Sequence, residues 1–178
     1  MNSTSLDYFS KLLSILPFYY FIYLGFSNFF TLTFGKNKEF KIIFLYTLGI
    51  ITSTLLTEIV KKFVNPNKYF KKYWYRPKGA KGCDYLSVSG YTPEYTPGFP
   101  SGHMATTAFF VFYNLIQTYN LKNKSTFTKI IYNTSNISLL GLMGWARMYK
   151  RCHSLVQVVA GTVVGGITAS IFYYLKFF

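Results

Sequence analysis

The sequence predicts an all-α protein, a polytopic transmembrane helical bundle with about five spans. Of its 178 residues, 51% are hydrophobic and only 13% are charged, which is typical of membrane proteins and excludes disordered, collagenous and coiled-coil chains. The 19 Lys and Arg outnumber the 5 Asp and Glu, and positive charge beside apolar spans is common at a bilayer surface. A soluble helical bundle would need charged outer stripes that the apolar segments lack. We expect a single integral-membrane domain over residues 1–178.

Two long apolar segments open the chain. Residues 12–34 carry no charge and, as a helix, reach across a hydrocarbon core of about 30 Å. We interpret this segment as mature chain, because it is too long and too aromatic for a signal peptide and has no convincing cleavage site. Residues 40–64 form the second predicted span. Glu58 is an acid inside that span, and Lys61 and Lys62 mark its polar end.

The segment 65–100 is rich in Pro, Gly, Tyr and basic residues, so it predicts an irregular surface loop and not a helix. Within it, residues 69–75 mix aromatic rings with lysines. Such a mixture suits the headgroup region, where rings and cations share the interface. We therefore expect an interfacial belt here that includes Trp74.

Three further helices are predicted after this loop. The first begins just after Pro100 and continues over residues 104–119, and the other two cover residues 130–145 and 155–175. The first half of 130–145 is polar, so it should pack that face against other helices. The last helix contains Gly161 and Gly165 at a spacing that permits close helix packing. Five spans would bring the loop 65–100 and residues 147–153 to one face.

Both histidines of the chain lie on that face. His103 belongs to Pro100-Ser101-Gly102-His103, which opens the third helix. Ser101 can cap this helix, Gly102 lets the backbone approach a ligand, and the free N–H groups can hold an anion. These residues predict an anion-binding helix start.

Arginine supplies further phosphate donors on the same face. Arg147 ends the fourth helix and Arg76 lies in the long loop, and planar guanidinium groups bind phosphate oxygens in pairs. His153 and Gln157 are four residues apart and share a helix face, so the Gln oxygen could accept a hydrogen bond from the imidazole. A neutral imidazole oriented in this way can attack phosphorus, while a second, protonated histidine donates to the departing oxygen.

With these motifs the sequence resembles the type 2 phosphatidic acid phosphatase and vanadium haloperoxidase superfamily over about residues 58–170. Pro100-Ser101-Gly102-His103 is identical to the family's Pro-Ser-Gly-His, and the segment from Ala146 to Gln157 matches its Ser-Arg-x5-His-x3-Asp at the Arg and the His. The resemblance implies a nucleophilic His153 and an acidic His103. It also implies phosphate binding by Arg76, Arg147, Ser101 and Gly102.

The sequence departs from the family pattern in three places. The family's first motif is Lys-x6-Arg-Pro, and Tyr69 stands seven residues before Arg76. We assign the lysine to Lys68 through a one-residue insertion; an alternative register uses Lys61, with Lys68 in place of the Arg. Ala146 removes a phosphate donor, and Gln157 replaces the carboxylate that would orient and stabilise the histidine.

The function implied by the resemblance is that of an integral membrane lipid phosphatase. It would hydrolyse a lipid phosphomonoester or pyrophosphate, such as phosphatidic acid or a polyprenyl phosphate, through a phosphohistidine and without a cofactor. A lipid headgroup phosphotransferase and a noncatalytic protein that binds anionic membrane lipids are the alternatives. We expect no metal site, because the few His, Cys and acidic residues lack ligand spacing, and no nucleic-acid partner, because apolar spans separate the basic clusters.

The chain contains two cysteines, Cys83 and Cys152, which could form at most one disulfide. Two free thiols are the default expectation, and pairing would require a lumenal or extracellular site face. The distribution of basic residues does not decide which face that is, because several of them are candidate phosphate ligands. The sequence also gives no indication of an oligomeric state.

Overall fold

The computed structural model describes residues 3–34, 37–81, 83, 95–120 and 124–175. The described residues form six helices: α1 Ser3–Phe34, α2 Asn37–Phe63, α3 Lys71–Trp74, α4 Gly102–Asn120, α5 Thr126–Tyr149 and α6 Leu155–Leu175. Apart from one isolated bridge between Tyr75 and Pro97, these residues contain no β-structure. The predicted all-α class is therefore confirmed.

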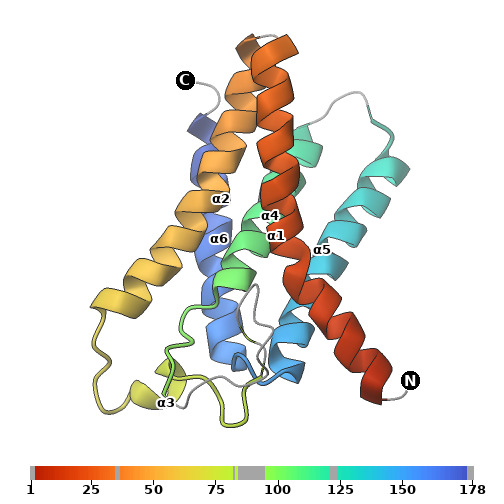
Figure 1. The fold of residues 1–178 in the computed structure, drawn as a ribbon. Helices are drawn as coiled ribbons and strands as arrows, with labels where there is room; N and C mark the ends of the chain where they lie inside the picture. The colour runs from red at the N-terminus through yellow and green to blue at the C-terminus, as the bar shows by residue number, and fades with distance from the viewer. Residues whose placement is uncertain (1–2, 35–36, 82, 84–94, 121–123, 176–178) are drawn as a thin grey trace.

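Helix α4 lies at the centre of the bundle and packs against α1, α2, α5 and α6 (Figure 1). Because neighbours surround it, residues 101–109 are all buried, which is the expected pattern for a core helix. Its rings Phe109 and Tyr113 join Ile50 from α2 and Tyr173 from α6 in the largest apolar cluster. This core fixes the position at which α4 begins.

Small residues bring α6 close to α4, as predicted. A side chain at Gly161 would collide with the backbone carbonyl of Ser101, and one at Gly165 with that of Ala105. The absence of side chains therefore lets the two backbones touch next to the start of α4. This contact places the first turn of α6 directly beside Ser101.

Two described stretches, Ile42–Phe63 and Leu155–Leu175, are long and apolar enough to cross a membrane. The chain enters α1 and leaves α6 at opposite ends of the bundle, and α3 lies at the end where α1 begins (Figure 1). Five crossings remain a prediction.

The five long helices fall where the sequence places them, and the short α3 lies inside the predicted loop. The polar half of α5 behaves differently from the prediction. Asn136 is buried, but Thr134, Ser135 and Ser138 are exposed. The hydroxyl of Ser135 donates to the carbonyl of Ile131 at 2.9 Å, so it is satisfied by its own helix without a neighbouring one.

Trp74 does not belong to an interfacial belt. Its side chain is only 2% exposed and packs between Phe70 and Phe99, with ring centroids 6.1 and 5.9 Å away. The loop folds back on itself, and these rings form its small apolar core. Tyr69, by contrast, is exposed.

Cys83 and Cys152 form a disulfide, with 5.3 Å between their Cα atoms, so the expectation of free thiols is wrong. The bond joins the segment after α3 to the turn between α5 and α6. Both sulfurs are buried together with Ala80. The disulfide thereby ties the long loop to the residue that precedes His153.

Candidate active site

A cavity of about 560 Å³ lies where α2 ends and α4 begins. Its wall includes both histidines, His103 from the first turn of α4 and His153 from the turn before α6. Gly102, Arg76 and Lys61 also line it. The fold thus brings the two imidazoles into one concave, positively charged space, which favours an anionic ligand.

The start of α4 is built as predicted. The hydroxyl of Ser101 accepts a hydrogen bond from the backbone N–H of Met104 at 3.4 Å, which caps the helix. The backbone N–H of Ser101 donates to the carbonyl of Gln157 at 3.1 Å. Ser101 is fully buried and does not line the cavity, whereas Gly102 does. In this structure Ser101 is therefore a cap, and Gly102 presents the backbone to the ligand.

The turn from Arg147 to His153 explains the five-residue spacing between them. Arg151 takes a left-handed conformation with φ 54°, and the N–H groups of Cys152 and His153 both donate to the carbonyl of Arg147, at 3.0 and 3.3 Å. With the bond from Arg151 N–H to Met148, this is a Schellman motif that ends α5. The motif folds the chain back, so His153 lies beside the last turn of α5.

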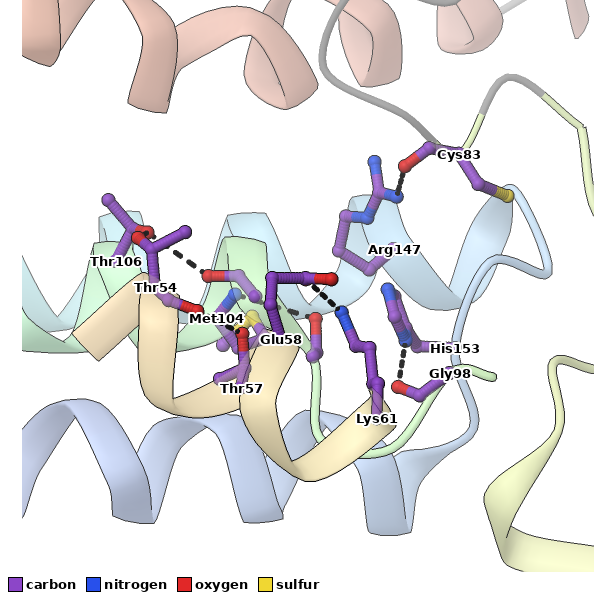
Figure 2. Close-up of polar contacts among 12 residues, drawn as sticks. Thr54, Thr57, Glu58, Lys61, Cys83, Gly98, Met104, Thr106, Arg147 and His153 are labelled. Carbon is purple, nitrogen blue, oxygen red and sulfur yellow. Dashed lines mark hydrogen bonds and ion pairs between the residues drawn. The ribbon is translucent and has the colours of Figure 1, made fainter. Parts of the chain in front are cut away.

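The imidazole of His153 is held by the main chain. Its Nδ1 lies 3.0 Å from the carbonyl oxygen of Gly98 (Figure 2). Because a carbonyl can only accept, Nδ1 carries the proton and Nε2 keeps its lone pair. The side chain is 3% exposed, so this geometry presents a neutral nucleophilic nitrogen in a largely dry site.

Burial lowers the pKa of His153 well below its usual value, and the charges of Arg147, Arg76 and Lys61 lower it further, in that order. The hydrogen bond to Gly98 opposes them only in part. The ring is therefore neutral across the physiological range, which is the form that can attack phosphorus.

Gln157 does not orient His153, contrary to our expectation from their spacing. Its amide nitrogen donates to the carbonyls of Tyr73 and Tyr75, both at 2.8 Å, and its oxygen accepts from the N–H of Ser154 at 3.1 Å. The amide therefore faces the loop that carries Arg76. Gly98 could not be predicted as the acceptor, because a backbone carbonyl has no residue signature.

The two arginines occupy different positions. Arg76 lines the cavity. Arg147 is fully buried behind it and donates to the hydroxyl of Ser14 at 3.0 Å and to the carbonyl of Cys83 at 2.6 Å, with His153 on its cavity side (Figure 2). Arg147 thus contributes a fixed positive charge near the histidines without forming part of the described wall. Ser14, from α1, was not a candidate in the sequence.

The structure combines the two registers of the first motif, because the cavity wall carries Lys61 from the alternative register and Arg76 from the register that we assigned. Lys61 lines the cavity and forms an ion pair with Glu58 at 2.5 Å, while Lys68 is exposed and lies off the wall. The Lys61 side chain is 14% exposed and that of Glu58 is 58% exposed, so the cation lies inside and the acid at the rim. Helix α2 extends to Phe63, which carries Lys61 to the site and leaves Lys68 beyond it. Glu58, three residues before Lys61 in an apolar span, was the signal that could have identified this pair.

Comparison with known proteins identifies the family of the chain. The sequence profile of the PAP2 superfamily matches residues 42–178, which is most of the chain and includes every cavity residue named above. The chain belongs to the PAP2 superfamily. Within this superfamily, a dolichyldiphosphatase from Saccharomyces cerevisiae is 30% identical over 79 residues, which are 44% of this chain and 33% of that protein. The matched region thus spans about a third of the length of the curated relative. No solved structure matches the chain.

The lowered pKa of His153 predicts that the acid limb of the pH–activity profile lies at unusually low pH. The nucleophilic role that the resemblance implies for His153 needs the neutral ring, so activity should fall where the ring gains a proton, and a lowered pKa moves that fall to a pH below the ordinary histidine value of about 6.5. The measurement is kcat/KM against pH, which reports the ionisations of the free enzyme, for a phosphate ester whose own ionisation is determined separately. Lys61→Ala removes one of the cations and should move the limb to higher pH, whereas Lys68→Ala should not. A limb at or above 6.5 in the unmodified protein would contradict this assignment.

Proposed function

We propose that the protein is an integral membrane lipid phosphatase that hydrolyses a lipid phosphomonoester or pyrophosphate through a phosphohistidine on His153, without a metal. The observation that carries the proposal is the shared cavity: two buried histidines, one from the first turn of α4 and one from the turn before α6, line one space with Arg76 and Lys61. Membership of the PAP2 superfamily and the similarity to a dolichyldiphosphatase support the same class of activity.

The reaction takes two steps. In the complex with the anionic substrate, which offsets the surrounding cations, His103 is protonated. In the first step, Nε2 of His153 forms a bond to phosphorus, the bond from phosphorus to the lipid oxygen breaks, and His103 gives that oxygen its proton. In the second, His103 takes a proton from a water molecule, which attacks phosphorus and releases His153 with inorganic phosphate. Arg76 and Lys61 stabilise the charge on the phosphoryl oxygens in both steps.

The outer face of α2 supports a lipid substrate. Thr54, Glu58 and Lys61 face the cavity, while other residues of the same helical turns carry large exposed apolar side chains: Leu55, Leu56, Ile59 and Phe63. A headgroup in the cavity can therefore leave its hydrocarbon chains against this apolar face, which suits the hydrocarbon region of a bilayer. A soluble sugar phosphate would gain nothing from it.

The noncatalytic alternative depended on the loss of the family's carboxylate at Gln157. The acceptor for His153 is instead available from Gly98, so the replacement does not leave the imidazole unoriented. We therefore favour a catalytic protein. A headgroup phosphotransferase would be recognised by labelled phosphate on a lipid acceptor in place of free phosphate.

The proposal is tested by phosphate release from the protein purified in detergent. The substrates are phosphatidic acid, lysophosphatidic acid, diacylglycerol pyrophosphate, a polyprenyl pyrophosphate and a soluble sugar phosphate. We expect release from at least one lipid substrate, clearly above the sugar phosphate, that persists in excess chelator and is blocked by vanadate. Activity that disappears with chelator, or that is highest on the sugar phosphate, would contradict the proposal.

Lys61 and Lys68 form a matched pair for testing the cavity wall. Lys61→Ala removes a cation from beside the phosphate and should lower kcat/KM on the best lipid substrate by about 100-fold, the usual order for a donor to developing charge. Lys68→Ala should leave kcat/KM within about threefold, as for a surface charge. Steady-state kinetics in mixed micelles measures both, and a larger loss from Lys68→Ala would return the role of the motif lysine to Lys68.

A further inference from the structure

Gln157 makes more polar contacts than its place in the family pattern explains. Its side chain is fully buried in the first turn of α6. The amide nitrogen has two protons, and three carbonyls surround it: those of Tyr73 and Tyr75 at 2.8 Å and that of Trp74 at 3.3 Å. The amide oxygen faces the N–H of Ser154. Since carbonyls only accept and N–H groups only donate, this orientation of the amide is the one that satisfies every partner.

The three carbonyls lead directly into Arg76, so the amide fixes the backbone from which this cation projects. The N–H of Arg76 then donates to Thr96 at 3.0 Å. A buried donor that holds consecutive carbonyls in place restricts the loop far more than its exposed lysines could. The position of Arg76 in the cavity therefore depends on Gln157.

The same amide supports the acceptor of His153. The N–H of Gly98 donates to the carbonyl of Trp74 at 2.8 Å, and the carbonyl of Gly98 accepts from His153. Gly98 also lies directly against the Gln157 amide: a Cβ at this position would come within 2.7 Å of its oxygen and 3.0 Å of Cγ of Arg76. One buried side chain thus supports both the nucleophile and a phosphate-binding cation.

A carboxylate cannot perform this task. Asp or Glu in its ionised form has no proton to donate, and it would direct negative charge at three carbonyl oxygens in a buried site. The hydrogen-bonding roles of the side chain and the backbone are therefore exchanged in this chain relative to the family pattern. The acceptor for the imidazole comes from the backbone, and the side chain at 157 has become a donor.

We propose that Gln157 is a positioning residue that braces Arg76 and the Gly98 carbonyl, and that this carbonyl orients His153 in place of a side-chain acid. The kinetic part rests on the proposed phosphatase function. It leads to an outcome opposite to the one that the family pattern suggests: introducing the family's Asp should impair the protein.

The kinetic test compares Gln157→Asp and Gln157→Glu with the unmodified protein. Both should lower kcat/KM on the best substrate by about 100-fold, the order expected when a catalytic group is displaced by about 1 Å. The Glu variant has nearly the shape of Gln, and its carboxyl can donate once it is protonated, so its activity should recover in part as the pH falls below neutrality. A role in stability alone would not produce that recovery. Equal or higher activity of Gln157→Asp would overturn the proposal.

A spectroscopic test does not depend on turnover. The chain has only two histidines, so labelling with [15N]histidine gives few signals, and His103→Ala identifies those of His153. We expect the tautomer with a proton on Nδ1 and none on Nε2, held by Gly98, and loss of that single tautomer in Gln157→Glu at neutral pH. A proton on Nε2 in the unmodified protein would overturn the proposal. If no substrate is hydrolysed, the proposed phosphatase function fails, and the tautomer still decides whether Gly98 orients the ring.

Discussion

His153→Ala abolishes phosphate release, with kcat/KM expected to fall by about four orders of magnitude or more, because no remaining group can take the phosphoryl group. His153 is the histidine whose ring is held in the neutral, Nδ1-protonated form by Gly98. Rapid quenching of the unmodified protein with labelled substrate should trap phosphate on the protein in an acid-labile, alkali-stable form, as expected of phosphohistidine. The variant should trap none.

His103→Ala is the matched control for this prediction. Its loss should depend on the leaving group, because a general acid matters less when the departing oxygen is already a weak base. In the first step, measured as the burst of nitrophenol release, a nitrophenyl phosphate ester should therefore recover much of the activity of His103→Ala and none of that of His153→Ala. The two roles would be reversed if the activated ester rescued His153→Ala and left His103→Ala inactive.

The sequence predicts the parts of the fold that depend on apolar length and helix ends. The sequence predicts a helix over residues 155–175, and α6 has the same bounds. Ser154 precedes this helix, and the glycines inside the helix allow close packing. The meeting of His103 and His153 also follows from sequence, because each lies where a helix begins at the same end of the bundle. Spacing along helices is sufficient to predict such an arrangement.

The remaining details depend on how the loop folds, which local patterns do not specify. Trp74 carries the signature of an interfacial ring, but it fills the core of its own loop. Lys61 and Lys68 fit the motif almost equally well, and only the observed end of α2 separates them. The acceptor at Gly98 is a backbone atom, so no residue type marks it.

Arg147 shows how distant segments change the role of a motif residue. Ser14, which lies 133 residues away in the sequence, and the carbonyl of Cys83 take the hydrogen bonds of its guanidinium. The buried guanidinium held in this way lowers the pKa of His153. The family motif therefore identifies the residue, and the fold determines which partners hold it in this chain.

The largest expected effect apart from those of the two histidines comes from breaking the Cys83–Cys152 disulfide. These residues are 69 positions apart, and closing a loop of that length stabilises a folded chain by about 4 kcal/mol in the chain-entropy estimate. The bond also fixes two contacts of the site. Cys83 lines the cavity and accepts from Arg147, and Cys152 directly precedes His153.

The double variant Cys83→Ser/Cys152→Ser should therefore lose both thermal stability and at least about tenfold in kcat/KM, within the range reported for displaced catalytic groups. Reducing agent should lower the activity of the unmodified protein to the same extent and should have no effect on the double variant, which serves as the control. Disulfides persist in oxidising compartments, so the protein isolated from membranes without reductant should show no thiol that reacts with a maleimide reagent. Two reactive thiols in fully active protein would show that the bridge neither forms in the cell nor holds the site.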